Sequence, residues 1–282
     1  MVNSLLTILQ CSACGGQISR NEKGCSCERC HRTYLKKGET FFFYRDEGNE
    51  ASRKADGIIF WLKSLVKKNP RVFTLLNHTL GIYVGTSARR SIAHLPKGAT
   101  ILNIGSGSEI IRDDVINLDS MPHPGVSLVA DAHALPLKTD SIDAVIAESV
   151  LEHVKDPERV VGEIYRVLKP GGMVYFVLPL IIGFHSSPDD YYRWTTSGTR
   201  ELLKRFEEKE LGIAAGPTNA MTYVLREWLA LVLSFNSRTV HQILVLFFMV
   251  LFAPLNLLDY ILRRYALADN IAHLYYYIGV KK

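Results

Sequence analysis

The chain has 282 residues, of which 48 % are hydrophobic, and a formal net charge of +5. This length leaves room for about two domains. The small positive charge argues against a nucleic-acid-binding protein, which concentrates Lys and Arg on one face, and suits an anionic membrane surface slightly better. Residues 1–10 have no basic start and no small-residue cleavage site. We therefore expect no signal peptide and predict a cytoplasmic location.

All five cysteines lie between positions 11 and 30. Cys11 and Cys14 form one C-x-x-C pair, and Cys27 and Cys30 form a second. Two close pairs separated by a short loop suit one tetrahedral zinc ion held by these four thiolates. A disulfide framework is the alternative, but the number of cysteines is odd and no secretory signal is expected.

Residues 1–46 are therefore predicted to form a small domain that resembles a zinc ribbon, with a strand over residues 40–44. The preferred interpretation is a structural Zn²⁺ that replaces a missing hydrophobic core in so small a module. The alternative is a role in substrate or partner recognition. Cys25 is a spare thiol or an alternative ligand, and the sequence leaves this open.

Residues 47–98 are predicted to form a linker followed by helices. The ranges 58–66 and 72–84 carry apolar residues at helical spacing and are separated by Asn69-Pro70. The spacing is typical of a pair of packed helices.

From residue 101 onward, strand and helix patterns alternate. A helix is predicted over 157–168, with apolar residues at helical spacing and an end at Lys169-Pro-Gly-Gly172. This alternation predicts an α/β fold with a doubly wound parallel sheet and helices on both faces. The short apolar runs that predict strands begin at Ile101 and cover 115–119, 129–131, 141–147 and 173–179.

The first of these strands ends in the turn Gly105-Ser-Gly107, and the second ends in Asp119. The glycines let backbone approach a ligand closely, and the acid can accept hydrogen bonds from two ribose hydroxyls. The third strand also ends in an acid, Asp131. A Gly-x-Gly turn alone is a weak signal, but the ordered set predicts a site for an adenosine cofactor.

Five motifs then occur in order, and with them the chain resembles the class I S-adenosylmethionine-dependent methyltransferases, in particular the type 11 group. The match covers roughly residues 99–218 and the last ten residues. The resemblance implies a seven-stranded Rossmann-like sheet and S-adenosyl-L-methionine as cofactor. The motifs are Asn103-Ile-Gly-Ser-Gly107, Asp119, Asp131-Ala132, the segment 148–154, and Arg166-Val-Leu-Lys-Pro-Gly-Gly172.

By this resemblance, Gly105 and Gly107 line the methionine part of the cofactor, Asp119 binds the ribose, and Asp131 binds the adenine amino group. The implied cofactor-binding set also contains Asn103, Ser106, Ala132 and Glu148. For the predicted helices at 58–66 and 72–84, the resemblance implies the alternative that they cover the active site. The cysteine segment in turn resembles zinc ribbons found on or beside some methyltransferases, including the eukaryotic activator subunit of tRNA and protein methyltransferases.

Two departures from the family pattern stand out. The third glycine of the usual loop is Ser108, and the stretch from Gly107 to Asp119 is too short for a full crossover helix. A degenerate fold that no longer binds cofactor is the alternative. The presence of both Asp119 and Asp131 argues against it.

Residues 183–195 are dense in polar and aromatic side chains and follow the fifth strand, at the edge where ligands bind in this fold. Methyl transfer to a hydroxyl needs close positioning and a nearby base. His185 is the predicted base, oriented by Asp189 or Asp190, and Arg193 is predicted to hold an anionic group. The alternative is that Asp190, Tyr192 and Arg193 tie the loop together. One of residues 195–197 is expected to cap a helix that ends near Phe206.

Two apolar stretches, 223–235 and 243–253, precede a predicted last strand at 272–279. That strand is expected to pair antiparallel with 209–215, which makes about 219–271 a helical insertion between neighbouring strands. Both ends of the insertion must then return to one side of any membrane, so a single span is excluded. A hairpin in one leaflet or helices in the interface are allowed. Burial as a cap or as a homodimer interface is the alternative.

The sequence thus favours a cytoplasmic methyltransferase, peripheral or monotopic at the inner membrane, that O-methylates a glycan, lipid-linked or other amphipathic small molecule. An RNA methyltransferase that uses the zinc ribbon is a second hypothesis. The weak charge and the sequence Ala147-Glu-Ser-Val150, in place of an Asn-Pro-Pro-Tyr-like motif, argue against it. A non-catalytic scaffold is the third hypothesis.

Overall fold

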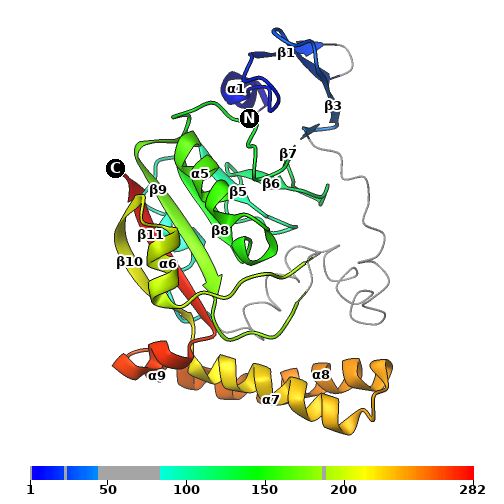
Figure 1. Cartoon of the computed structure of the whole chain (residues 1–282), viewed down its shortest axis with the longest axis vertical. Coiled ribbons are helices and arrows are strands. Elements are labelled where there is room, and N and C mark those ends of the chain that lie inside the picture. Colours follow the sequence, from blue (N-terminus) through cyan, green and yellow to red (C-terminus); the bar gives the residue numbers. More distant parts are fainter. Residues whose placement is uncertain (1, 22–23, 44–82, 186–188) are drawn as a thin grey trace.

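The structure is a computed structural model that describes residues 2–21, 24–43, 83–185 and 189–282. Its described strands form one mixed sheet in the order β1-β2-β3-β4-β7-β6-β5-β8-β9-β11-β10 (Figure 1). The strands are β1 Ile18–Asn21, β2 Gly24–Cys27, β3 Thr33–Lys37, β4 Thr40–Phe42, β5 Ile101–Ile104, β6 Ile116–Asp119, β7 Leu128–Val129, β8 Ile142–Glu148, β9 Leu168–Pro179, β10 Phe206–Ala215 and β11 Leu274–Lys281.

The predicted doubly wound sheet is confirmed in the part from β7 to β10. Strands β7, β6, β5, β8 and β9 run parallel, whereas β11 is antiparallel to both β9 and β10. All four residues of β5 are buried, as expected for a central strand covered on both faces. The carboxyl ends of the parallel strands therefore meet at one edge, which is where the sequence places its acids and glycines.

The helices beside the sheet are short. α5 follows the prediction, because Asp156 accepts a hydrogen bond from Arg159 N, Pro157 occupies the first turn, and the apolar face is buried. The described helices outside the insertion are α1 Val2–Ile8, α4 Ala88–Ser91, the 3₁₀ turn η2 Leu151–His153, α5 Pro157–Val167 and α6 Thr196–Leu202.

Several predicted boundaries were wrong. β9 begins at Leu168 rather than Met173, because Leu168 already pairs with Ile142 of β8. α6 is capped by Thr195 as expected but ends at Leu202, since β10 starts at Phe206. The segment after β8 forms only the turn η2. The described stretch from Gly107 to Asp119 has no helix, which agrees with the predicted loss of the crossover helix. The predicted helices at 58–66 and 72–84 lie outside the described residues, apart from 83–84.

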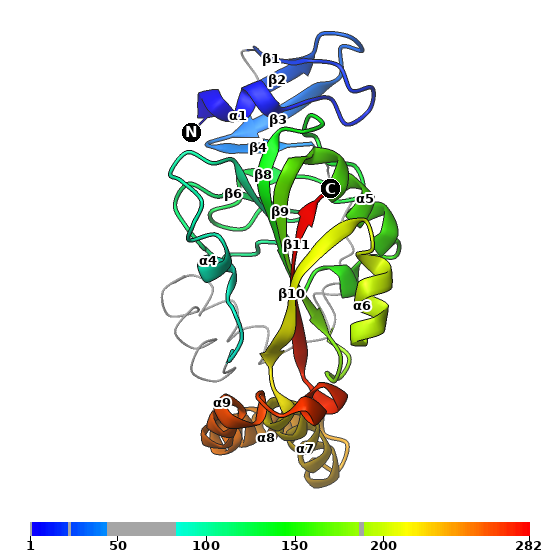
Figure 2. The same ribbon diagram turned by 90° about the vertical axis from the view of Figure 1, so that its left-hand side faces the viewer.

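The N-terminal module, described over residues 2–21 and 24–43, continues the large sheet at its β7 edge. β4 pairs in parallel with β7 through Phe41–Leu128 and Phe42–Val129. Figure 2 shows β1 to β4 at the end of the molecule opposite α7 and α8. A second connection joins residues 8–10 to the loop after β7, where Gln10 N donates to Pro136 O at 3.0 Å. Residues of the module, such as Leu5, Leu9 and Phe41, belong to the same hydrophobic cluster as the core of the large sheet. The module and the large sheet therefore share one core.

The apolar insertion is confirmed between β10 and β11. α7 Pro217–Leu233 and α8 Arg238–Phe252 form a helical hairpin, hereafter the apolar hairpin. The chain returns to β11 through η3 Ala253–Leu258, α9 Asp259–Leu262 and η4 Ala266–Ile271. The hairpin and the N-terminal module lie at opposite ends of the long axis (Figure 1). One described helical stretch, Arg238–Leu262, is long and apolar enough to cross a membrane, by length and composition alone.

A buried carboxylate fixes the base of the apolar hairpin. Asp259 is fully buried and accepts hydrogen bonds from the backbone N–H groups of Thr218 at 2.8 Å and Asn219 at 3.0 Å. The carboxylate thereby satisfies N–H groups at the first turn of α7 and lies at the positive end of that helix. Nearby, Thr222 donates to the buried side chain of Asn256 at 2.9 Å.

We expect Asp259→Ala to lower the free energy of unfolding by about 3 kcal/mol, because two buried N–H groups lose a charged acceptor. Urea unfolding of the full chain measures this change. Asp269→Ala, at an exposed position of the same insertion, is the matched control and is expected to have little effect. An equally small effect of both substitutions would show that Asp259 does not hold the hairpin.

Candidate active site

The turn after β5 has the close approach that a bound cofactor requires. Gly105 has φ +66°, and a Cβ there would lie 2.4 Å from Cγ2 of Val150. Gly107 has φ +54°, and its N–H donates to Oδ2 of Asp119 at 2.8 Å. Only glycine suits Gly105, because a side chain would be strained and would also collide with Val150. The turn is thus held between the end of β6 and the segment after β8.

The polar groups of this turn fit an adenosine-type ligand. The hydroxyls of Ser106 and Ser108 are buried and have no hydrogen-bond partner among the described residues. Ser108, at the position of the usual third glycine, thus adds a hydroxyl to the turn. Asp119 also accepts from Met121 N at 2.9 Å, yet each carboxylate oxygen has a second lone pair for a ribose hydroxyl.

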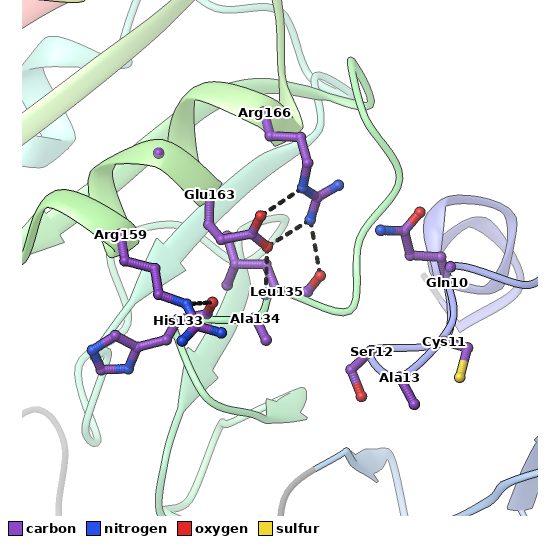
Figure 3. Close-up of a pocket in the computed structure, with 12 residues that line it drawn as sticks. Gln10, Cys11, Ser12, Ala13, His133, Ala134, Leu135, Arg159, Glu163 and Arg166 are labelled. Atoms are coloured by element: carbon purple, nitrogen blue, oxygen red, sulfur yellow. Dashed lines mark hydrogen bonds and ion pairs between the residues drawn. The ribbon is translucent and has the colours of Figure 1, made fainter. Parts of the chain in front are cut away.

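The loop that carries Asp131 is held from two sides. Asp131 accepts a hydrogen bond from His133 N at 2.9 Å, and Ala132 lies between these two residues. On one side, Arg159 of α5 donates to His133 O at 3.0 Å and Arg166 donates to Leu135 O at 3.0 Å. On the other side lies the N-terminal module, separated from α5 by a cavity of about 480 Å³ (Figure 3). The module therefore helps to position the loop that carries Asp131.

Two further residues of the predicted cofactor set, Asn103 and Glu148, lie on strands rather than in the glycine turn. Asn103 is buried within the sheet and donates to Oδ1 of Asn117 at 3.3 Å, so its amide connects β5 to β6. Glu148 ends β8, and burial, with the nearby Glu109, raises the pKa of its carboxyl to about 8. Burial thus shifts Glu148 toward its neutral, protonated form.

The four predicted cysteine ligands come together in the N-terminal module. Cys11 Sγ lies 3.6 Å from Cys30 Sγ, and Cys14 Sγ lies 3.5 Å from Cys27 Sγ, with all four sulfurs within 4.8 Å of one another. Zinc–sulfur bonds of about 2.3 Å place tetrahedral ligands roughly 3.8 Å apart, so this cluster fits a zinc ion. Cys25 is buried and is not part of the cluster, although the sequence left its role open.

The two C-x-x-C segments have the same backbone geometry. In the first, Gly15 N donates to Cys11 O at 2.8 Å; in the second, His31 N donates to Cys27 O at 3.0 Å. Gly15 and His31 both have a left-handed conformation, with φ +70° and +58°. The N–H of Cys30 also points at Cys27 Sγ and lowers the pKa of the Cys27 thiol. His31 thus serves the turn and is exposed, away from the metal-binding position.

The loop after β9 brings together the three residues predicted for catalysis. Asp190 accepts from His185 N at 3.0 Å, and its Oδ2 lies 3.4 Å from Nδ1 of His185. Arg193 donates to the same carboxylate at 2.6 Å and to the carbonyls of Ile182 and Gly183. Hydrogen bonding from Arg193 lowers the pKa of Asp190 to about 2. The guanidinium is thus occupied by the loop, as the structural alternative for Arg193 predicted.

Sequence reasoning missed Glu152, which lies beside His185. Its side chain is fully buried, and neither carboxylate oxygen has a hydrogen-bond partner among the described residues. Burial raises the pKa of Glu152 to about 7 and lowers the pKa of His185. The sequence does contain an acid next to a histidine, Glu152-His153, directly after a strand end. The third residue of the group, His185, lies more than thirty residues further along the chain, so sequence spacing did not connect them.

Comparisons with known proteins find similarity to methyltransferases. Residues 104–176 match a family model described as "Methyltransferase domain". The chain is 30 % identical over 95 residues to 2-methyl-6-phytyl-1,4-hydroquinone methyltransferase 1 of Oryza sativa, and 47 % identical over 53 residues to demethylmenaquinone methyltransferase of Streptomyces avermitilis. These matches cover 29 % and 18 % of this chain and 29 % and 23 % of the relatives.

Among solved structures, phosphoethanolamine N-methyltransferase 2 of Haemonchus contortus, in complex with S-adenosyl-L-methionine, is 18 % identical, with a TM-score of 0.44. That match covers 77 % of this chain and 59 % of that protein. The chain spans less than a third of the length of the first curated relatives that it matches. Residues 104–176 thus match a methyltransferase domain, and the strand order and the glycine turn at the carboxyl edge show its Rossmann-like α/β fold.

Proposed function

We propose that the protein is an S-adenosylmethionine-dependent methyltransferase that methylates an oxygen of an amphipathic acceptor at the cytoplasmic face of the inner membrane. The acceptor class is a glycan, a lipid-linked molecule or another amphipathic small molecule. The observation that carries this proposal is the position of the apolar hairpin. β10 runs parallel to β9, so α7 begins at the carboxyl edge of the sheet, and Tyr223 of α7 lies against Gly183 of the loop with His185.

The apolar hairpin exposes far more hydrophobic surface than a solvated helix pair needs. Phe235 at its tip is 90 % exposed, and Trp228, Leu231, Phe247 and Val250 are each more than half exposed. Soluble monomers rarely expose a large continuous apolar patch, and such patches mark membrane or protein contacts. Because both ends of the hairpin return to neighbouring strands, the orientation that fits is in the plane of the interface.

The names of two relatives agree with an amphipathic acceptor. One is named for 2-methyl-6-phytyl-1,4-hydroquinone, a ring diol with a hydrocarbon phytyl chain, and the other for demethylmenaquinone. An acceptor with a hydrocarbon chain could keep that chain among the exposed residues of the apolar hairpin while its polar part reaches His185.

The loop residues take distinct roles in this proposal. Bound S-adenosylmethionine supplies an electrophilic methyl group, and the acceptor oxygen must lose its proton as it attacks. His185 promotes that loss, because Asp190 lies beside its Nδ1 and leaves Nε2 for the reacting group. Arg193 is a positioning residue, since its donors hold Asp190 and the backbone of residues 182–183.

For the cysteine cluster we propose a structural zinc ion held by Cys11, Cys14, Cys27 and Cys30. The module that contains it lies far from the apolar hairpin (Figure 1) and beside the loop of Asp131. This position supports a role in holding the cofactor loop over a role in acceptor recognition.

Vesicle partition tests the membrane part of the proposal. The double variant Trp228→Gln with Phe247→Gln removes two exposed apolar side chains from the apolar hairpin. If both insert into lipid, their loss costs roughly 3 kcal/mol, so we expect partition to anionic vesicles to fall about 100-fold. The matched control, Leu35→Gln with Ile110→Gln, changes two exposed apolar residues elsewhere and is expected to partition like the wild type.

Equal partition of both variants would contradict membrane contact through the apolar hairpin. A dimer that does not bind vesicles, and that dissociates in the hairpin variant, would assign the same surface to a homodimer interface. For the chemistry, transfer of labelled methyl from S-adenosylmethionine into the lipid-extractable fraction of a membrane extract is expected for the wild type and lost in His185→Ala. Label found only in RNA would show that the acceptor is RNA and not an amphipathic small molecule.

A further inference from the structure

Three side chains outside the glycine turn converge on one buried point. Oε1 of Glu152 lies 3.9 Å from Nε2 of His185 and 4.0 Å from Nε2 of His153. All three atoms lie within 4.8 Å of one another. The two imidazole rings meet edge to face, with centroids 4.8 Å apart. The chain thus places two nitrogens and one buried carboxylate around a space that an ion can enter.

In both histidines, Nδ1 faces a hydrogen-bond acceptor. Nδ1 of His153 lies 2.6 Å from Asp189 O, and a carbonyl oxygen can only accept a hydrogen bond, so this nitrogen carries the proton. Nδ1 of His185 lies near Gly183 O and Oδ2 of Asp190, which are also acceptors. In the neutral rings, Nε2 therefore presents a lone pair to the carboxylate of Glu152.

When Glu152 is ionised, its carboxylate faces the two Nε2 lone pairs at 3.9 and 4.0 Å, so three electron-rich atoms face one another. Glu152 is fully buried, and its oxygens have no hydrogen-bond partner among the described residues. A buried carboxylate without a partner costs several kcal/mol, unless a positive charge compensates for it. Histidines whose Nδ1 is bound to a carbonyl or a carboxylate are also the usual arrangement behind metal ligands.

We infer that Glu152, His153 and His185 bind a divalent transition-metal ion, through one carboxylate oxygen and two Nε2 atoms. Two imidazoles and one carboxylate favour Zn²⁺, Co²⁺ or Fe²⁺ over Mg²⁺ and Ca²⁺, which prefer oxygen ligands. Three protein ligands leave at least one coordination position open for water or for an acceptor oxygen.

The position of this site relates it to the proposed function, on which its catalytic role rests. Val150 packs against Gly105 of the cofactor turn, and Glu152 follows two residues later. Tyr191 N donates to Glu152 O at 2.7 Å, which ties the site to the acceptor loop. An acceptor hydroxyl bound to the ion would lose its proton to solvent more easily. Its oxygen would then form the C–O bond as the S–C bond of the cofactor breaks and the electron pair stays on sulfur. With the ion bound, Nε2 of His185 would be a ligand, and this role would replace its role as the base that takes the acceptor proton.

Cobalt titration of the full chain tests the site directly. The protein is first loaded with zinc at the cysteine cluster and then titrated with Co²⁺, followed by its visible absorption and by metal counting after gel filtration. We expect one bound cobalt per chain in the wild type, with a spectrum that lacks sulfur-to-cobalt charge transfer. In Glu152→Gln we expect at least 100-fold weaker binding, because the only anionic ligand is lost. His241→Gln, on α8 and outside the cluster, is the control and should bind like the wild type.

The outcomes separate this inference from the proposed function. Absence of a second metal in the wild type, or equal cobalt binding in Glu152→Gln, would overturn the inference. If Glu152→Gln does not fold, His185→Asn in the half-exposed loop replaces it, with the same expected loss. Cobalt binding as expected together with failure to bind S-adenosylmethionine would keep the metal site and overturn the methyltransferase proposal. Binding of S-adenosylmethionine without binding of cobalt would overturn the metal site and keep the methyltransferase proposal.

Discussion

Replacement of Asp119 by alanine is expected to weaken the binding of S-adenosylmethionine at least 100-fold. The carboxylate is the group available for the two ribose hydroxyls, and each such charged hydrogen bond contributes about 1.5 kcal/mol or more. Two lost bonds correspond to about 3 kcal/mol, or roughly two orders of magnitude in Kd. The substitution also frees the N–H of Gly107, so the glycine turn loses its connection to β6.

Calorimetric titration of the zinc-loaded protein measures this effect. Asp113→Ala is the matched control, because Asp113 is an exposed acid in the same stretch between the turn and β6. It is expected to bind like the wild type. Absence of binding even in the wild type would mean that Ser108 and the shortened crossover have disabled the cofactor site. The hypothesis of a non-catalytic scaffold would then replace the methyltransferase proposal.

Cys27→Ser is expected to remove one zinc ion per chain and to unfold the N-terminal module. Structural zinc sites contribute on the order of 10 kcal/mol or more to the folding of small modules, and loss of one thiolate ligand forfeits most of that. The effect should extend to the cofactor, because residues 8–10 of the module hold the loop that follows Asp131. We expect S-adenosylmethionine to bind about tenfold more weakly, which corresponds to a loss of about 1.4 kcal/mol of binding free energy when the loop must be ordered by the cofactor itself.

Cys25→Ala provides the control for this experiment within the same strand. Cys25 is as deeply buried as Cys27, yet it lies outside the cluster. The variant is expected to keep its zinc and its cofactor affinity, with a modest loss of stability from packing. Loss of zinc in Cys25→Ala would make Cys25 a ligand. Unchanged cofactor affinity in a zinc-free Cys27→Ser protein would show that the module does not support the loop of Asp131.

Features encoded by neighbouring residues could be predicted from the sequence. The parallel strands were predicted from apolar runs that end in Gly105, Asp119 and Asp131, and the cysteine cluster was predicted from two C-x-x-C pairs. The insertion before the last strand followed from the pairing expected for residues 272–279. Each of these depends on local spacing and on the general rules of parallel sheets.

Features that depend on contacts between distant segments could not be predicted. Glu152 becomes a candidate site residue only because the fold places His185 beside it, and more than thirty residues separate the two in the sequence. The pairing of β4 with β7 joins residues separated by more than eighty positions, with no local pattern that specifies it. The end of α6 was wrong by four residues, because the start of β10 determined where the helix stopped.

The pairing of β4 with β7 also determines whether the edge of the large sheet is open to aggregation when the N-terminal module unfolds. β7 has two residues and would be the outermost strand of the large sheet without β4. An uncovered edge presents free N–H and C=O groups that can pair with another copy of the chain. Metal depletion of cells is therefore expected to yield insoluble aggregates of this protein, because the zinc ion that we propose would protect the sheet edge against self-association by keeping the module folded.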